Sequence, residues 1–298
     1  MPTDGAVLRP RRNIDAHVHL WRLARGDNAT LSAAEPVLFR DYEPEHIEPL
    51  LDAAGIDAVI VVQAATTLAE TLFTLGLAER HPWIAAVVGW VDPSSPSLDE
   101  EFAALAVNPR FRGVRPIRDD NASIAWMLDA RHERCWHLLA ERGLVLEFLV
   151  QNPDEVPLLT HFATHHPDLG IVLDHCAKPD IAGGRFEPWA SDMAGLARRR
   201  NVSCKLSALP NSARPGAGAD TLRPFSDVLL ATFGAERLIW ASDWPPLLRA
   251  VDYASWRRIS LELLAGLSED ERRAVLGENA VRIYRLPAEP DTVTRRRG

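Results

Sequence analysis

Two histidines separated by one residue are the first sign of chemistry in this sequence. His17 and His19 lie in the segment Asp15-Ala-His17-Val-His19, near the start of the chain. In a β-strand, residues two positions apart point to the same side, so both imidazoles are expected to face one region. Buried imidazoles have ring nitrogens that need partners, which suits half of a metal site or a polar network around a carbonyl oxygen. Ordinary hydrogen-bonded histidines are the alternative when the pair is considered alone.

Three further titratable residues lie at or just beyond the ends of later apolar segments: His175, Lys205 and Asp243. If those segments are parallel strands of one barrel, their carboxyl ends surround one opening and the three side chains meet the histidine pair there. Such convergence of titratable groups is typical of an active site. For Asp243 the alternative is a helix N-cap, because prolines follow it closely.

Lysine is nearly absent from this chain. Of 33 basic residues only Lys178 and Lys205 are lysine, and the others are arginine. A retained lysine is therefore a modest indication of a place that needs a compact, rotatable ammonium group.

Four more residues are candidates for contact with a substrate. Glu147 interrupts an apolar segment, which is costly unless it binds a ligand, contacts substrate or forms an ion pair. Arg115 suits a substrate carboxylate or a lactone oxygen, with a buried pair to Glu147 or Asp174 as the alternative. Trp21 and Trp244 offer aromatic faces to a sugar ring, with ordinary packing as the alternative.

The elements that would position these residues are short apolar runs rich in Val and Ile. Runs without strict alternation are typical of strands buried on both faces, as in a parallel sheet. Eight of them, separated mostly by helical patterns, predict an α/β fold of the (β/α)₈ TIM barrel type. They are Asn13–Leu20, Ala58–Gln63, Ile84–Val91, Phe111–Ile117, Leu144–Val150, Gly170–Ala177, Asn201–Leu206 and Arg237–Ser242.

Helices are predicted at Leu68–Arg80 and Asp154–His165, and a capping box at Ser268 begins a helix that extends to about Leu286. Long loops at Trp21–Arg40 and Pro210–Asp220 follow strands, so they should lie on the face where barrels build active sites. We expect one barrel domain over residues 13–287, a disordered leader over 1–12 and a disordered tail over 288–298.

Composition excludes several classes of function. A formal net charge of −8 argues against a nucleic-acid partner. No run of roughly 18 apolar residues is present, which argues against a membrane partner. The three cysteines form no metal-binding or disulfide pattern, and no secretory signal is recognised, so a cytoplasmic location is expected. The oligomeric state stays open, with a homo-oligomer among the options.

The sequence resembles the amidohydrolase-related (amidohydrolase 2) family, in its lactonase group. That group includes L-fucono-lactonase, L-rhamnono-lactonase and 2-pyrone-4,6-dicarboxylate lactonase. The resemblance extends from about Asn13 to Leu286 and is carried by Asp15-Ala-His17-Val-His19-Leu-Trp21, Val88-Gly89-Trp90-Val91-Asp92, Gly113-Val114-Arg115, Asp174-His175-Cys-Ala-Lys178-Pro179, Cys204-Lys205-Leu206-Ser207 and Ala241-Ser242-Asp243-Trp244-Pro245.

The resemblance implies a metal-dependent-hydrolase type of barrel whose reaction centre comprises His17, His19, His175 and Asp243. Members with two metals use a carboxylated lysine and two further histidines, whereas this chain offers Glu147 in the corresponding strand. We therefore expect at most one divalent ion, a zinc held by His17, His19 and Asp243, or no metal.

The resulting hypothesis is a hydrolase that opens a small sugar-acid lactone or related carboxylated lactone. Asp243, with a pKa raised by the barrel mouth, would deprotonate water and later return the proton. The three histidines would polarise the carbonyl, and Lys205 would add positive charge. Three alternatives stay open: a zinc-dependent decarboxylase, an amidase, and a non-catalytic barrel that binds a sugar acid.

Overall fold

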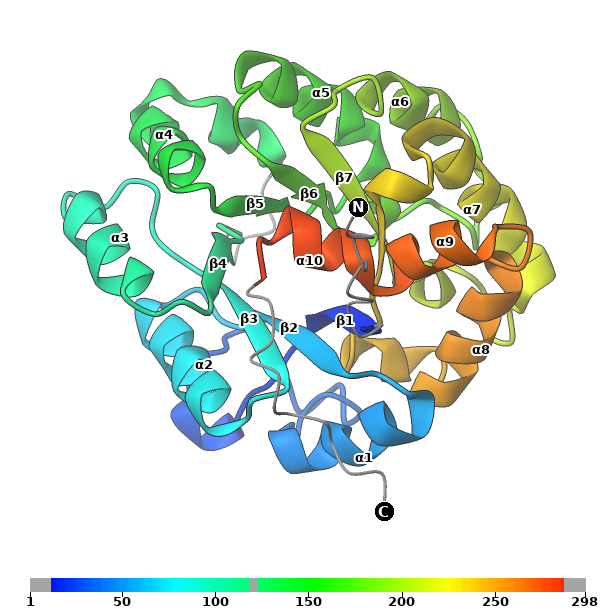
Figure 1. Cartoon of the computed structure of the whole chain (residues 1–298), viewed down its shortest axis with the longest axis horizontal. Helices are drawn as coiled ribbons and strands as arrows, with labels where there is room; N and C mark the ends of the chain where they lie inside the picture. Colours follow the sequence, from blue (N-terminus) through cyan, green and yellow to red (C-terminus); the bar gives the residue numbers. More distant parts are fainter. Residues whose placement is uncertain (1–11, 118–122, 287–298) are drawn as a thin grey trace, which may run out of the picture.

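A computed structural model describes residues 12–117 and 123–286 of the chain. Within them, eight parallel strands form one sheet in the order of the sequence, and helices surround it (Figure 1). The predicted (β/α)₈ barrel is confirmed. The strands are β1 Ile14–Val18, β2 Ala58–Val62, β3 Ile84–Gly89, β4 Phe111–Val114, β5 Val145–Phe148, β6 Ile171–Leu173, β7 Val202–Leu206 and β8 Leu238–Trp240.

The α-helices from α1 to α8 alternate with the strands and form the outer ring, and α9 and α10 follow α8. They are α1 Pro44–Ala54, α2 Leu68–Arg80, α3 Leu98–Ala106, α4 Glu133–Arg142, α5 Val156–His165, α6 Trp189–Leu196, α7 Ala219–Phe233, α8 Tyr253–Leu263, α9 Glu269–Arg273 and α10 Asn279–Ile283. The predicted bounds of α2 and the capping box at Ser268 are confirmed. The last predicted helix is interrupted by a π-helical turn at Ala274–Glu278.

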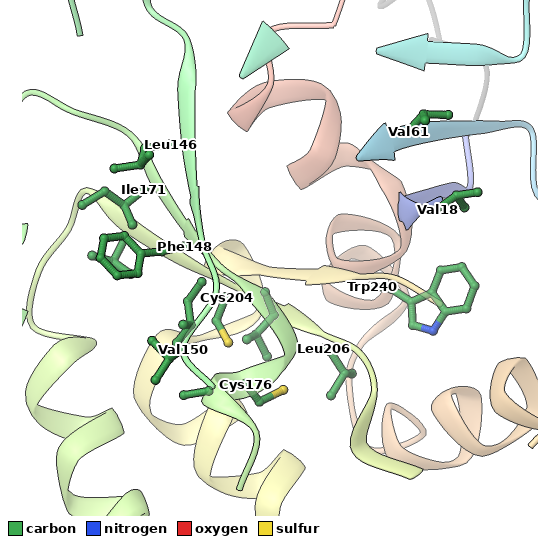
Figure 2. Packing of buried hydrophobic residues seen from close by; sticks show 14 of the residues in the cluster. Val18, Val61, Leu146, Phe148, Val150, Ile171, Cys176, Cys204, Leu206 and Trp240 are labelled. Atoms are coloured by element: carbon green, nitrogen blue, oxygen red, sulfur yellow. The ribbon is translucent and has the colours of Figure 1, made fainter. Parts of the chain in front are cut away.

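The strands are apolar on both faces because each face has its own core. Phe148, Ile171 and Leu206 point outward and pack against the helices (Figure 2). Alternate positions such as Val172 and Ile239 belong to a second, smaller cluster inside the barrel. Two buried faces explain why the strand segments lack the polar alternation of a half-exposed sheet.

The amino-terminal mouth of the barrel is closed by the end of the described chain. Helix α10 lies across the barrel centre (Figure 1), and Asn279 donates hydrogen bonds to the carbonyls of Ala235 and Leu238 at the start of β8. Tyr284, just after α10, is 1 % exposed and packs in the inner cluster. This plug leaves the carboxyl ends of the strands as the place for a site.

The barrel closes between β1 and β8 without a regular ladder. Val18 and Trp244 form an isolated parallel bridge, the amide of His19 donates to the carbonyl of Trp244 at 2.8 Å, and the amide of Asp243 donates to the carbonyl of His17 at 3.0 Å. The seam therefore fixes Asp243 directly beside the histidine pair.

No described helix is long and apolar enough to span a bilayer. Cys135, Cys176 and Cys204 are buried and free. The predicted leader, apart from its last residue, and the predicted tail lie outside the described residues. The cytoplasmic location stays a prediction.

Candidate active site

A change of register in β1 turns His17 into the barrel. The pairing of β1 with β2 shifts between Asp15 and Val18. Asp15 accepts a hydrogen bond from the Tyr253 hydroxyl of α8 at 2.8 Å, whereas His17 contacts residues inside the barrel. Such an irregularity re-aims side chains near a site. The Nε2 atoms of His17 and His19 lie 3.1 Å apart, as the spacing predicted.

His175 reaches the site from a turn and not from a strand. The prediction that the sixth strand continues to Ala177 is wrong, because β6 ends at Leu173. Four consecutive residues from His175 to Lys178 then adopt left-handed backbone angles, with φ between 47° and 56°. This conformation costs roughly 1–2 kcal/mol per residue for non-glycine residues. The turn aims His175 into the barrel, and backbone strain of this kind is often found at active sites.

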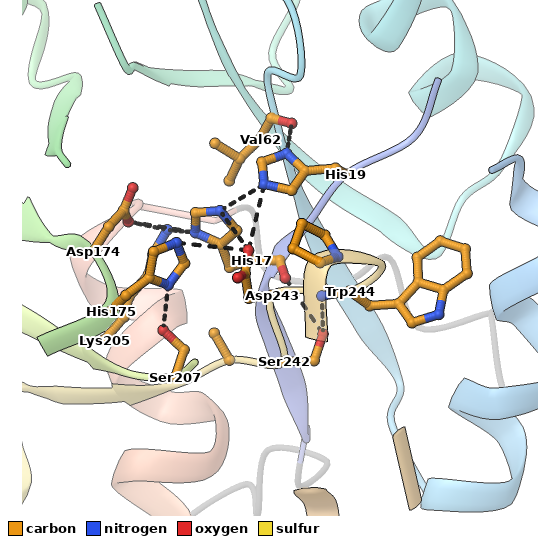
Figure 3. Close-up of polar contacts among 12 residues, drawn as sticks. His17, His19, Val62, Asp174, His175, Lys205, Ser207, Ser242, Asp243 and Trp244 are labelled. Atoms are coloured by element: carbon orange, nitrogen blue, oxygen red, sulfur yellow. Dashed lines mark hydrogen bonds and ion pairs between the residues drawn. The ribbon is translucent and has the colours of Figure 1, made fainter. Parts of the chain in front are cut away.

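Asp243 is the point on which the three histidines converge (Figure 3). Its Oδ1 lies 3.7 Å from His17 Nε2, 3.5 Å from His19 Nε2 and 3.6 Å from His175 Nε2. Asp243 also has a left-handed backbone, with φ 61°, immediately after the seam. The four residues predicted as the reaction centre are therefore brought together.

Neighbouring groups fix the orientation of two imidazole rings. His19 Nδ1 lies 2.9 Å from the Val62 carbonyl, which can only accept, so Nδ1 carries the proton and Nε2 presents a lone pair. His175 Nδ1 lies 2.9 Å from the Ser207 hydroxyl, which leaves its Nε2 facing Asp243. Such supporting contacts are typical of metal-ligating histidines.

Burial sets the protonation of these groups. It lowers the pKa of His175 to about 4, and burial followed by the charge of Lys205 lowers the pKa of His17 well below its usual value. Both rings are neutral near pH 7, the state that binds metals. Burial raises the pKa of Asp243, but the histidines outweigh it and the net shift is downward. The expected upward shift of the Asp243 pKa is therefore wrong.

A buried ionic cluster lies beneath His17. Lys205 is 0 % exposed, and its Nζ lies 2.6 Å from Glu147 Oε1, 3.1 Å from Asp174 Oδ1 and 2.8 Å from His17 Nδ1. Tyr284 of the plug donates to Glu147 Oε1 at 2.6 Å. Lys205 thus contacts the reaction centre through His17, on the side away from Asp243.

Arg115 belongs to the same buried layer. Its Nη2 donates to the carbonyl and the side-chain oxygen of Gln63 at 2.8 and 2.9 Å, and its Nη1 donates to Asp174 at 3.2 Å. The sequence predicts either substrate contact or a buried ion pair for Arg115, and the structure shows the ion pair with Asp174. Contact of Arg115 or Glu147 with substrate stays a prediction.

The donor set at Asp243 fits one metal ion. His17, His175 and Asp243 offer ligand atoms within 4.8 Å of one another, and His19 Nε2 lies 3.5 Å from Asp243 Oδ1. Around a tetrahedral zinc with bonds of about 2.0–2.2 Å, ligand atoms lie roughly 3.3–3.6 Å apart. The distances from Asp243 Oδ1 to the three imidazoles, 3.5 to 3.7 Å, are close to this range, whereas the Nε2 atoms of His17 and His19 are closer together at 3.1 Å.

Two groups lie beside His17 Nδ1, on the side of the ring away from Asp243. The Lys205 ammonium is 2.8 Å from Nδ1, and Asp174 Oδ1 is 3.4 Å from it. A second group of donors, His17, Glu147 and Asp174, surrounds the ammonium of Lys205, which already supplies positive charge there.

A pocket of about 310 Å³ opens beside Asp243. The loops after β6, β7 and β8 line it, including residues 210–217 of the long loop predicted at Pro210–Asp220. Its polar lining includes Lys178 and Asn211, neither of which was predicted as a site residue. The scarcity of lysine was the one signal for Lys178, and no sequence signal distinguished Asn211.

The two tryptophans lie in an aromatic cluster away from this lining. Trp21 and Trp244 are 5 % and 2 % exposed, and their rings pack against Tyr42 at 5.1 and 5.0 Å between centroids. The structure therefore favours packing for both, and their contact with substrate stays a prediction.

The cluster of His17, His19, His175 and Asp243 at the carboxyl ends of the barrel strands is the arrangement that the resemblance to the amidohydrolase family implies. Comparison with known proteins agrees. The amidohydrolase family model matches residues 14–286, and the chain belongs to this family.

Two relatives and one solved structure are similar over nearly the whole chain. An L-fucono-1,5-lactonase of Burkholderia ambifaria is 39 % identical, covering 92 % of this chain and 95 % of its own. An L-fucono-1,5-lactonase of Burkholderia multivorans is 36 % identical, covering 93 % and 97 %. A crystal structure of a Burkholderia multivorans amidohydrolase with bound zinc is 35 % identical, covers 93 % of this chain and 100 % of that one, and superposes with a TM-score of 0.86.

Proposed function

We propose that this protein hydrolyses a small lactone, with a sugar-acid lactone as the favoured class. The observation that carries the proposal is the convergence of three imidazole Nε2 atoms on Asp243 Oδ1, beside a pocket. The two L-fucono-1,5-lactonases among its relatives support the choice of a cyclic ester over an amide or a carboxylate.

Asp243 is the proton carrier of this mechanism. Its low pKa keeps it ionised, and its contacts with the histidines use Oδ1, so Oδ2 is left to accept a proton from the attacking water. The new bond joins the water oxygen to the lactone carbonyl carbon. The bond from that carbon to the ring oxygen then breaks, and Asp243 returns the proton to the departing oxygen. The product carries a hydroxyl and a carboxylic acid, which ionises and releases one proton.

The histidines would hold the metal ion that stabilises the carbonyl oxygen. A zinc ion held by His17, His19, His175 and Asp243 would supply a Lewis acid at that oxygen. The neutral rings of His17 and His175 keep the site from repelling such an ion. Lys205 acts as a positioning residue, because its ammonium contacts His17 Nδ1 and holds the imidazole ring in place.

Proton release with lactone substrates tests the proposal. A pH-indicator screen would compare aldonolactones with muconolactone-type lactones, with and without a chelator. We expect acid release with at least one lactone and a loss of rate in chelator. Release of CO₂ from an aromatic acid or of an amine from an amide, with no lactone opened, would contradict the proposal.

Metal content is a second test. We expect one zinc per chain by elemental analysis of the active protein, because Lys205 occupies the other donor group. Two equivalents of metal in active protein would overturn this assignment.

A further inference from the structure

The pocket beside Asp243 contains a lysine that the proposed mechanism does not use. Lys178 lines the pocket, and its ammonium donates to the neutral side-chain oxygen of Gln151. Among residues 12–117 and 123–286, no carboxylate lies within ion-pair distance of it. The other lining cations have partners, since Arg249 pairs with Glu35 at 3.1 Å and Arg214 donates to the Ala182 carbonyl at 3.0 Å.

The backbone ties Lys178 to the reaction centre. It is the last of the four left-handed residues, and His175 is the first. The turn that aims His175 at Asp243 therefore also carries Lys178 to the pocket wall. Packing of His175 alone does not require the strain to continue through Lys178.

Asn211 provides an unpaired acceptor in the same lining. Its Nδ2 donates to the Pro246 carbonyl at 2.8 Å, which fixes the amide orientation and leaves Oδ1 as the free end. This Oδ1 is buried and has no hydrogen-bond partner in the described part of the chain. An unpaired buried acceptor costs about 1–3 kcal/mol, so the position suits a donor on a bound molecule.

A donor and an acceptor in the lining of one pocket match a hydroxyl group, which both donates and accepts. A carboxylate only accepts, so it would face the Asn211 oxygen and the Asp243 carboxylate unfavourably. We propose that Lys178 and Asn211 form a hydroxyl-binding subsite that selects a polyhydroxylated lactone. The ammonium donates to a ring hydroxyl, and that hydroxyl or its neighbour donates to Asn211 Oδ1.

This inference rests on the proposed lactonase function, and a ratio of rates tests it. The probes are a six-carbon aldono-1,5-lactone and δ-valerolactone, which has the same ring without hydroxyls. Lys178→Met should lower kcat/KM for the aldonolactone relative to δ-valerolactone by about 10–100-fold, the effect of losing one charged hydrogen bond. Asn211→Ala should lower the same ratio by about tenfold. The ratio cancels the amount of folded enzyme, so partial misfolding does not change it.

Arg185→Met is the matched control. Arg185 lies in the same loop, pairs with Asp154 outside the pocket lining, and its loss removes one positive charge. This control should leave the ratio unchanged. Equal losses on both substrates in Lys178→Met would overturn the subsite, as would a selective loss on a carboxylated, muconolactone-type substrate.

A binding measurement separates the subsite from the reaction. If the wild-type protein opens no lactone, the proposed function fails, and calorimetry with a neutral open-chain alditol, which has hydroxyls but no carboxylate, tests the subsite alone. Binding that weakens at least tenfold in Lys178→Met would support it. No binding by the wild type, or equal binding by both proteins, would overturn it.

Discussion

The two lysines of this chain occupy opposite environments on the two sides of the histidine cluster. Lys205 is fully buried and surrounded by Glu147, Asp174 and His17 at 2.6 to 3.1 Å. Lys178 lies at the pocket and, within the described residues, has a neutral partner only. The protein forms close ion pairs with the first lysine but not with the second. A cation whose ion pairs are all within the protein stabilises the fold, whereas one without a close ion pair at a pocket can bind a ligand.

Asp243 lies between the two environments, and its removal should have the largest effect. Asp243→Asn should fold and lose lactonase activity by about 10³-fold or more, because the carrier of the proton is gone. Steady-state kinetics and circular dichroism would measure both properties. Activity within a few-fold of the wild type would remove Asp243 from the mechanism.

Lys205→Met should destabilise the fold by about 3–5 kcal/mol, because it leaves Glu147 without its buried cation and Asp174 with Arg115 alone. Lys178→Met should change the free energy of unfolding by less than about 0.5 kcal/mol, since no buried counter-charge depends on it. Urea unfolding of the two variants compares them directly.

Lys205→Arg is the charge-preserving variant for this comparison. It should fold but lose most activity, because a guanidinium does not fit the closed space beneath His17. Similar unfolding free energies for both methionine variants, or wild-type kcat/KM in Lys205→Arg, would contradict the contrast between the lysines.

Tyr284→Phe tests the buried ionic cluster around Lys205 from the amino-terminal end of the barrel. The Tyr284 hydroxyl donates to Glu147 at 2.6 Å inside the barrel. Its loss should cost about 1–3 kcal/mol, as for other hydrogen bonds to charged groups. The ratio of rates on hydroxylated and unsubstituted lactones should not change, because the pocket lies at the other end of the barrel. A changed ratio would show that the two environments are coupled.

A further expected effect is a dependence of stability on pH. His175 has a pKa of about 4 in the folded protein because of burial, against 6.5 ordinarily. The unfolded chain therefore binds a proton that the folded chain does not, and stability should fall as pH decreases from about 6.5 to 4. His17 acts in the same direction. Urea unfolding in chelator at several pH values would measure the slope.

His175→Gln should reduce this slope, whereas His161→Gln, on the exposed face of α5, should keep it. Equal slopes in the wild type and His175→Gln would contradict the contribution of His175.

The sequence predicted the members of the site better than the local backbone that holds them. The spacing of His17 and His19 and the position of Asp243 after an apolar segment depend on strand periodicity and barrel topology, which are regular. The shift in β1 and the left-handed turn at His175 are irregular, and nothing in residue type marks them, since non-glycine residues occupy the turn. Tyr284 and Asn211 join the site through tertiary contacts that no local pattern encodes.

The seam between β1 and β8 also sets the order in which the site can be assembled during synthesis. His17 belongs to β1, which leaves the ribosome before β8, and Asp243 follows β8. The amide of Asp243 donates to the carbonyl of His17, so the carboxylate and its backbone anchor arrive together. Until then β1 and β7 are open sheet edges that can pair with other chains. A nascent chain that stops before β8 is therefore both inactive and exposed to aggregation, and closure of the barrel completes the active site.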